Sequence, residues 1–357
     1  MTIKMTGLSF LSRKQEAEMR RLQVTGGSTY IVSLPKKWVT KNQLKKGSLL
    51  QISEEDDGSL AVSSQSTLVT DKKSGEALIK VSPNDNPNTM VRKAVSAYLV
   101  GYNMIHIKIQ DRQQMTSRQR NMVKDFARRL LVGTEIVTDT PTELILQVLL
   151  SYPELSIQSA LRRMCIITSS MHKDALTALR NLDSQLARSV IATDDEVDRF
   201  NLYVVRQLKT AIQNPRIIKE TGLKNARDCL GYRLVTKSVE RAADHAVSIA
   251  ENVLLLKKPT DEEILKNLEE MSSLAVSLFE TAIEALFRLD FDLAETVIQK
   301  TKDVRFPMKE VLLSSKRIGT EEVASLRLVI ESLRRTAEYA SDIAEIVLNM
   351  TVESIVG

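Results

Sequence analysis

The stretch RLVTKSVERAADHAVSIAENVLLL, Arg233–Leu256, decides the fold because the chain contains it twice. A shift of 94 positions places it on RLVIESLRRTAEYASDIAEIVLNM, Arg327–Met350, with 12 identities in the 22 pairs through Leu254. A second match, at a shift of 107, relates Met164–Ile191 to Met271–Ile298. Self-similarity at a long offset indicates one supersecondary unit used twice. We therefore predict that the C-terminal two hundred residues are two copies of one helical module.

The positive charge of the chain is concentrated at its N-terminus. The whole chain has 357 residues and a formal net charge of +5. Residues 1–50 contain ten Lys and Arg against two Glu, a balance of +8, so the other 307 residues sum to −3. Such an asymmetry indicates a polyanionic partner for the N-terminal segment.

The sequence is typical of a cytoplasmic protein. Its two cysteines, Cys165 and Cys229, form no CxxC pair, which suits a reducing compartment and argues against a structural zinc knuckle. No apolar run approaches the roughly 18–20 residues of a membrane-spanning helix. The first residues also lack the apolar segment of a signal peptide.

Residues 1–63 are predicted to form a small β-rich domain around one short helix. Gly26-Gly27 and Asp57-Gly58 each separate two strand-like runs, which indicates two hairpins. Pro35 favours the start of the helix PKKWVTKNQL between them. Strands of about five residues and one short helix bury too little surface to be stable alone, so we expect this domain to dimerise.

The run RLQVTGGSTYIVSLPKKWVTKNQLKKGSLLQISEEDDGSLAVS resembles the SpoVT/AbrB swapped-hairpin DNA-binding domain in its archaeal form, over about 45 residues. The resemblance implies that two chains interleave their hairpins into one β-barrel and present basic side chains to DNA. A solvated basic surface that only aids solubility is the alternative. The candidate phosphate contacts are Arg20, Arg21, Lys36, Lys37, Lys41, Lys45 and Lys46.

Residues 64–152 are predicted to form a small α/β domain. Four strand-like runs, EALIKVS, MIHIKIQ, TEIVTDT and ELILQVLLS, alternate with two helical segments in the order β-α-β-α-β-β. This order predicts a sheet with helices on one face. The segment contains no glycine-rich phosphate loop or nucleophile motif, and its role is not predicted. His106 alternates with isoleucines, which favours the solvent face of a strand.

From Leu155 onward the chain is predicted to be helical, as two tandem three-helix bundles spanning residues 153–258 and 259–357. In the first copy we expect a helix over 157–181, a short helix capped by Asp183, a longer helix opened by a capping box at Thr193, and a helix over 223–256. In the second copy we expect helices over 262–288, 293–314 and 320–349. The fold class is therefore multidomain and mainly α.

Two pairs of carboxylates in the first copy are candidate metal ligands. Asp194 and Asp198 are four residues apart, as are Glu240 and Asp244, so each pair lies on one face of its helix. Pairs on neighbouring helices can converge on a hard cation. The alternative is structural: Asp194 favours a first helical turn, and Glu240 can pair with Arg233 or Arg241.

These carboxylates and the run SVERAADHAVSIAE resemble the signature of the PhoU family of phosphate-uptake regulators, which are built from tandem three-helix repeats. The resemblance covers about 200 residues. It implies iron or zinc clusters on the bundle, and interaction with a phosphate transporter ATPase and a sensor kinase. In the second copy Arg334 replaces Glu240 and Glu338 replaces Asp244, so we expect at most one metal cluster, in the first copy.

The other acidic residues and histidines of the bundles are not among the candidate metal ligands. Glu338, Asp342 and Glu345 are interpreted as a solvated acidic face. His245 projects about 100° away from Asp244 around the helix, which favours packing, or a position behind the metal ligands, over direct ligation. His172 receives no assignment.

The leading functional hypothesis is a dimeric, non-enzymatic regulator of phosphate uptake. Its N-terminal domain would bind DNA, and its helical bundles would signal phosphate status through a metal or a partner protein. One alternative is an adaptor that docks on a transporter ATPase without binding DNA. A metal-dependent phosphoesterase is a weaker alternative, because the sequence offers no nucleophile beside a base.

Overall fold

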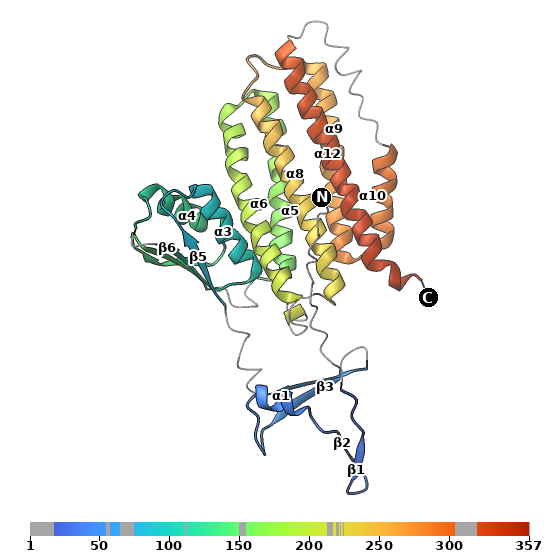
Figure 1. Cartoon of the computed structure of the whole chain (residues 1–357). Coiled ribbons are helices and arrows are strands. Elements are labelled where there is room, and N and C mark those ends of the chain that lie inside the picture. Colours follow the sequence, from blue (N-terminus) through green and yellow to red (C-terminus); the bar gives the residue numbers. More distant parts are fainter. Residues whose placement is uncertain are drawn as a thin grey trace, which may run out of the picture. The chain divides into compact units, whose positions relative to one another are not determined.

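The computed structural model of the chain describes residues 18–54, 58–64, 75–110, 113–149, 155–212, 217–218, 221, 223, 225–303 and 320–356. The chain divides into two compact units, Met1–Lys73 and Ser74–Gly357. Figure 1 shows the strands of the first unit and the helices of the second. None of the helices in the described ranges is long and apolar enough to cross a lipid bilayer.

The first unit, called the head below, consists of two hairpins and one helix, as the sequence predicts. Strand β1 (Gln23–Thr25) pairs with β2 (Thr29–Ile31), and β3 (Leu50–Glu54) pairs with β4 (Leu60–Ser64), both antiparallel. Helix α1 (Lys36–Lys41) lies between them in the chain and follows Pro35. Gly26 and Gly27 supply the positive φ angles, 61° and 88°, of the first turn. In the described part of the single chain the two hairpins are separate two-stranded sheets.

The second unit begins with the α/β domain, whose element order agrees with the prediction. Its four-stranded sheet has the order β5-β6-β8-β7, with β5 parallel to β6 and the other pairs antiparallel. Apolar side chains of the sheet and the two helices form one buried core. The helices α3 and α4 therefore cover one face, and both also contact α6 of the bundle. The elements are β5 (Glu76–Val81), α3 (Pro87–Val100), β6 (Met104–Ile109), α4 (Ser117–Leu130), β7 (Thr134–Asp139) and β8 (Glu143–Val148).

The open face of this sheet carries His106, as its alternation with isoleucines predicts. Ile105 and Ile107 are fully buried under the helices. The imidazole of His106 lies 3.0 Å from the carboxylate of Glu143 and 3.8 Å from that of Glu76. It is thus part of a polar network that crosses the strands.

The bundle contains the six long helices expected of two three-helix copies. The first and fourth of these begin and end at the predicted residues. The third helix of each copy differs from its prediction by a few residues. The second helix of the second copy was predicted to extend to residue 314, and the part beyond residue 303 lies outside the described residues. The helices are α5 (Ile157–Asn181), α6 (Ser184–Ala211), α8 (Ala226–Val253), α9 (Glu262–Arg288), α10 (Phe291–Asp303) and α12 (Thr320–Thr351), followed by the short helix η1 (Val352–Ser354).

The predicted helix start at Thr193 is wrong. Asp183 caps the helix by accepting bonds from the amides of Gln185 and Leu186, as expected, but the helix then continues without a break to Ala211. The hydroxyl of Thr193 donates to the carbonyl of Ser189 at 2.9 Å, within the helix. A Thr-x-x-Glu pattern opens a helix only where the preceding backbone is extended, and no Gly or Pro interrupts this one.

The two copies share one core, and their matching third helices, α8 and α12, pack against each other antiparallel. The ends of α8 and α12 are joined by ion pairs, with Arg227 2.6 Å from Glu353 and Lys257 3.1 Å from Glu321. Corresponding positions of the repeat therefore meet near the middle of these helices. At this point the buried His172 Nε2 lies 2.8 Å from the carbonyl of Ala242 and 3.3 Å from the hydroxyl of Thr336. Thr336 is the residue that matches Ala242 in the repeat, at a shift of 94. Buried side chains of both copies form a continuous cluster around this centre.

Candidate functional site

A cluster of four carboxylates lies on α6 and α8 of the first copy. The four-residue spacings place Asp194 and Asp198 on one face of α6, and Glu240 and Asp244 on one face of α8. Electrostatic repulsion acts between the helices as well as within them, since Asp194 is repelled by Asp198, Asp244 and Glu240. The two predicted pairs therefore lie near each other on neighbouring helices.

Burial and repulsion raise the pKa of three of these carboxyl groups, those of Asp194, Asp198 and Asp244. Burial is the main cause that raises the pKa of Asp194 to about 7, followed by repulsion from its acidic neighbours. The pKa of Asp244 is raised to about 6 by burial and then by Glu240. The pKa of Asp198 is raised for the same two reasons. One oxygen of Asp194, Oδ1, is buried without a hydrogen-bond partner among the described residues. An acidic site of this kind favours a cation.

Two cationic side chains stand at the border of the cluster. Lys237 pairs with Glu240 on the same helix. Arg129, on α4 of the α/β domain, lies 3.1 Å from Asp195, and its charge offsets part of the rise in the pKa of Asp198. The i,i+3 spacing of Lys237 and Glu240 is visible in the sequence, whereas nothing in the sequence indicates that Arg129 reaches α6. The α/β domain is thus connected to the acidic cluster.

The carboxylates suit a divalent cation in charge but do not form a closed ligand set. Oxygen donors and the unpartnered Asp194 Oδ1 fit a hard cation. Within the described ranges, however, no three His, Cys, Asp or Glu side chains are grouped closely enough to hold a metal ion. A metal at these residues would need their side chains to rotate toward one another. The metal-ligand assignment stays a prediction.

In the second copy a guanidinium group occupies the place of the acidic cluster. Arg334 bonds Glu331 through two nitrogens, at 2.6 and 3.0 Å, and also pairs with Glu338. Arg335 bonds the other oxygen of Glu338 at 2.6 Å. The interpretation of Glu338 as part of a solvated acidic face is therefore wrong, because two arginines neutralise it. Asp342 and Glu345 are exposed, as expected.

The histidines of the bundle pack between helices. His245 turns toward α12, where its ring centroid lies 5.8 Å from that of Tyr339, the residue at the matching position of the repeat. This agrees with the prediction that it packs. His172 is the buried histidine at the centre of the shared core, and burial lowers its pKa to about 4.

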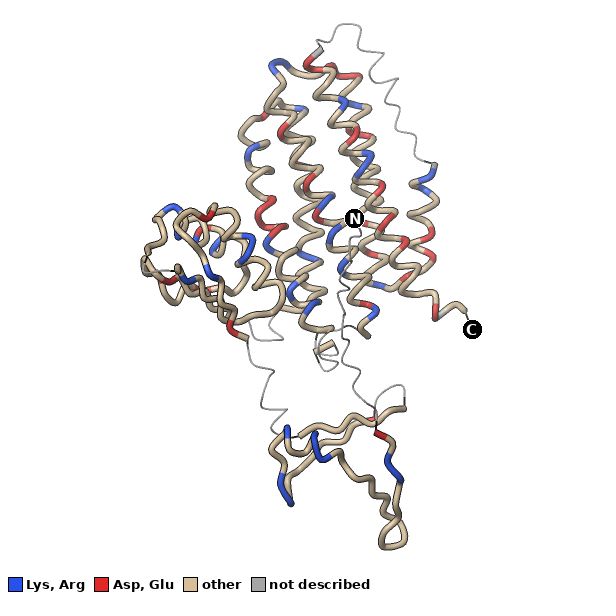
Figure 2. Tube along the Cα trace, in the orientation of Figure 1, with Lys and Arg blue, Asp and Glu red and all other residues tan. Residues whose placement is uncertain are grey.

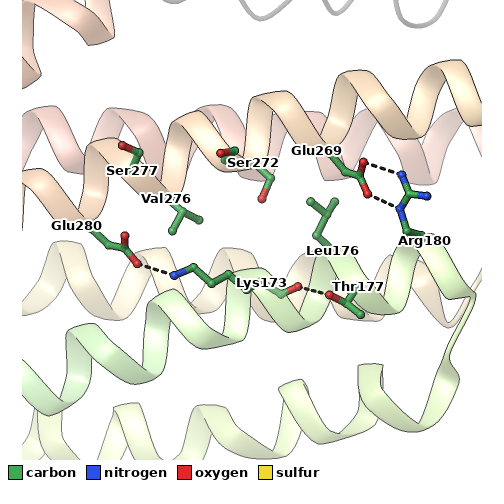
Figure 3. A pocket seen from close by; sticks show the side chains of 10 residues that line it. Lys173, Leu176, Thr177, Arg180, Glu269, Ser272, Val276, Ser277 and Glu280 are labelled. Carbon is green, nitrogen blue, oxygen red and sulfur yellow. Dashed lines mark hydrogen bonds and ion pairs between the residues drawn. The ribbon is translucent and has the colours of Figure 1, made fainter.

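A groove of about 370 Å³ runs between α5 and α9, the first helices of the two copies (Figure 3). At one end Lys173 lies 2.8 Å from Glu280, and at the other Arg180 binds both oxygens of Glu269. Hydroxyl groups line the space between them, including Thr177, Ser272 and Ser277. Since both cations are already neutralised, we interpret this groove as a polar contact between the copies.

The seven predicted DNA-contacting cations are all exposed on the head. Figure 2 shows that blue segments predominate there. Among the described residues of the head, only Arg20 has a carboxylate partner, Glu18. Lys36, Lys37 and Lys41 lie on α1. Their charges are thus available to a polyanion.

The head also exposes many of its apolar side chains. No apolar side chain in its described part is buried, and no core cluster forms in it. The exposed fraction is 68% for Tyr30, 62% for Ile52 and 66% for Leu60, all on the hairpins. Burying one such side chain stabilises a fold by about 1.5–3 kcal/mol. Burial of these side chains at an interface would therefore favour association of the head with another protein surface.

Comparison with known families matches two parts of the chain. The PhoU domain matches twice, over residues 161–253 and 268–347, and the antidote-toxin recognition MazE family of bacterial antitoxins matches residues 23–68. These ranges cover most of the bundle and most of the head.

Curated relatives and solved structures extend this result. The phosphate-specific transport system accessory protein PhoU homolog 1 of Thermotoga maritima is 24% identical over 200 residues, which are 54% of this chain and 84% of that protein. A homolog from Clostridium acetobutylicum is 23% identical over 195 residues, 53% of this chain and 88% of that protein. The crystal structure of PhoU from Pseudomonas aeruginosa shares the bundle fold, with a TM-score of 0.50 and 22% identity over 55% of this chain and 96% of that one. The chain therefore consists of an N-terminal MazE/AbrB-like domain, an α/β domain and a bundle that is made of two PhoU domains.

Proposed function

We propose that this protein is a non-enzymatic regulator of phosphate transport that binds DNA through its head as a dimer. The two PhoU domains support the regulatory part, because the relatives that match them are named accessory proteins of phosphate-specific transport. The MazE-like head supports the DNA-binding part. The bundle would respond to phosphate status, and its bound state would alter DNA binding by the head.

The observation that carries DNA binding is the set of exposed cations on the head. Six of the seven have no carboxylate partner among the described residues. Each phosphate that a lysine or arginine neutralises releases condensed counterions, which makes the affinity depend on salt. In a dimer the two copies of α1 double the number of such contacts. The exposed apolar hairpins would provide the dimer contact.

DNA binding can be tested by fluorescence anisotropy with a labelled duplex of mixed sequence, titrated from 50 to 300 mM salt. In the triple variant Lys36→Glu, Lys37→Glu, Lys41→Glu we expect the affinity to fall at least tenfold and the salt dependence to flatten. The matched control changes the same charge on the bundle, with Lys209→Glu, Lys266→Glu and Lys300→Glu, all exposed. Equal affinity of the two variants would remove DNA from the proposal and leave the adaptor function.

We further propose that Asp194, Asp198, Glu240 and Asp244 hold a divalent cation such as iron or zinc. The cation would neutralise the cluster and set its carboxylates in one arrangement. Because Arg129 of the α/β domain pairs with Asp195 beside it, neutralising the cluster would alter the contact between α4 and α6. This gives a route by which the state of the bundle reaches the α/β domain.

The metal proposal can be tested by elemental analysis and by thermal unfolding of protein purified without chelators. We expect the variant Asp194→Asn, Glu240→Gln to contain less bound metal than the unmodified protein. Its Tm should no longer rise when metal is added. The control, Glu196→Gln with Glu251→Gln, neutralises two exposed acids on the same two helices. The proposal is wrong if both variants retain as much metal as the unmodified protein.

A further inference from the structure

Strand β5 forms an edge of the α/β sheet, and no other strand in the described part of the chain pairs with its outer side. It lies at one end of the strand order, and it pairs with β6 in an unbroken register from Glu76 to Val81. The opposite edge strand, β7, is interrupted by a register shift between Ile136 and Thr138. Bulges of that kind protect a sheet edge from pairing, whereas a regular edge strand offers its backbone groups to another strand.

The surroundings of β5 leave room for an added strand. A groove of about 500 Å³ runs beside it, lined by residues of β5 and by Thr89, Arg92, Lys93 and Ser96 of α3. Leu78, at the middle of the strand, is 57% exposed. Ala77 and Ile79 point to the helix side and are only half-buried there. Both faces of the strand thus have apolar surface that a neighbouring strand would cover.

The sequence of β5 is complementary to itself. In an antiparallel pair centred on Leu78, Glu76 of one strand stands opposite Lys80 of the other, and Leu78 stands opposite Leu78. The same register places the small Ala77 opposite the larger Ile79 on the helix side. Opposed side chains lie on the same face with Cβ atoms about 4.5–5.5 Å apart, so these pairs of opposite charge and of apolar groups would be in contact.

We propose that β5 pairs antiparallel with β5 of a second copy, about a two-fold axis at Leu78, so that the two sheets become continuous. A two-fold contact of this type requires a self-complementary surface, which the Glu76–Lys80 strand supplies. An acidic strand of another protein fits less well, because it would meet the carboxylate of Glu76. Of the cations in the groove, Lys93 is in addition already paired with Asp85, at 3.7 Å. The inference is independent of the function proposed for the head and the bundle.

Cysteine cross-linking in the full chain tests the contact directly. Leu78→Cys would place two thiols face to face at the axis, and Val137→Cys on the opposite edge, 53% exposed, is the matched control. Cys165 and Cys229 are buried and should not react. With mild oxidant or a short bis-maleimide, we expect at least fivefold more covalent dimer from Leu78→Cys than from Val137→Cys. A dimer made only by the head would raise the local concentration of both thiols alike, so equal yields overturn the proposal.

A charge swap distinguishes self-pairing from another occupant. In the Leu78→Cys protein at low salt, Lys80→Glu would place the carboxylate of Glu76 opposite a second carboxylate on both sides of the axis. We expect the yield of cross-linked dimer to fall to the Val137→Cys level. Adding Glu76→Lys restores opposite charges across the pair and should restore the dimer yield. If Lys80→Glu has no effect, or if the second change fails to rescue it, the antiparallel register about Leu78 is wrong.

Discussion

Arg206 of α6 lies over the ring of Tyr98 of α3, with its guanidinium carbon 4.7 Å from the ring centroid. The same guanidinium donates to the main-chain carbonyls of Tyr98, Gly101 and Tyr102 and to the side chain of Asn103. These carbonyls belong to the C-terminal end of α3, where the helix dipole favours a cation. One buried arginine therefore attaches the α/β domain to the first PhoU domain.

Removing this guanidinium should loosen the attachment. Because Arg206→Ala removes a buried guanidinium that bonds three carbonyls and Asn103, we expect the free energy of unfolding to fall by about 2–4 kcal/mol. Hydrogen exchange at the end of α3 should also become faster. Urea unfolding and exchange mass spectrometry measure the two effects. Lys209→Ala, at an exposed position of the same helix, should change neither. Unaltered exchange in α3 would show that other contacts hold the domain.

The acidic cluster should make the protein less stable as the pH rises. The folded-state pKa of Asp194, about 7, is above its ordinary value of 3.8, so between these pH values the folded state binds more protons than the unfolded state. The stability that comes from protonation of Asp194 in the folded state is therefore largest below pH 4 and is lost by pH 7–8. With metal chelated, Asp194→Asn should stabilise the protein at pH 8 by about 1–2 kcal/mol, a figure reduced for partial exposure, and by much less at pH 4.5.

Urea titrations of the Asp194 variant at the two pH values make this measurement. Glu196→Gln, an exposed acid two residues away, should show no such pH-dependent gain. A stabilisation of Asp194→Asn that is equal at both pH values would mean that repulsion within the cluster is not its cause.

His172 should have the opposite pH dependence. Burial lowers its folded-state pKa from 6.5 to about 4, so below pH 6.5 the unfolded state binds the proton first. Stability is then lost as the pH falls from 6.5 to 4, by about 3 kcal/mol in total. His172→Gln keeps a donor for the carbonyl of Ala242 but does not titrate. The difference in unfolding free energy between the variant and the unmodified protein should therefore change by this amount between pH 7 and 4. A difference that is the same at both pH values would contradict the prediction.

The contact between the PhoU domains has a small residue, Gly231, at a close approach of two helices. A Cβ at Gly231 of α8 would come within 2.8 Å of Met350 Sδ and 3.3 Å of Ile346 Cγ2 on α12. Gly231→Ala should be nearly neutral, since the gain in helix propensity, about 1 kcal/mol, offsets a shift of the flexible methionine. Gly231→Leu should destabilise the protein by about 1–3 kcal/mol by overpacking. Thermal unfolding of both variants checks this, and a harmless leucine would mean that the helices can separate there.

Local sequence patterns predicted many elements but failed where a pattern needed its surroundings. Helices α5 and α9 begin and end as predicted because caps and apolar periodicity are local properties. Thr193 has the pattern of a helix start, yet the helix passes through it, since a hydroxyl can bond back to the preceding turn. The pairing of Glu338 with two arginines was also missed, although its i,i+3 and i,i+4 spacings were visible.

The sequence by itself determined the duplication, the helical class of the bundle, the cationic head and the two carboxylate pairs, because identity, periodicity, charge and four-residue spacing are properties of the chain alone. Only the tertiary structure decided that Asp194 lies near Asp244, that Arg129 and Arg206 reach across to other elements, and that His172 lies where the two copies meet. These relationships depend on how each helix is rotated about its axis when the core packs. That rotation is fixed by the fit of many buried side chains at once, and no local pattern encodes it.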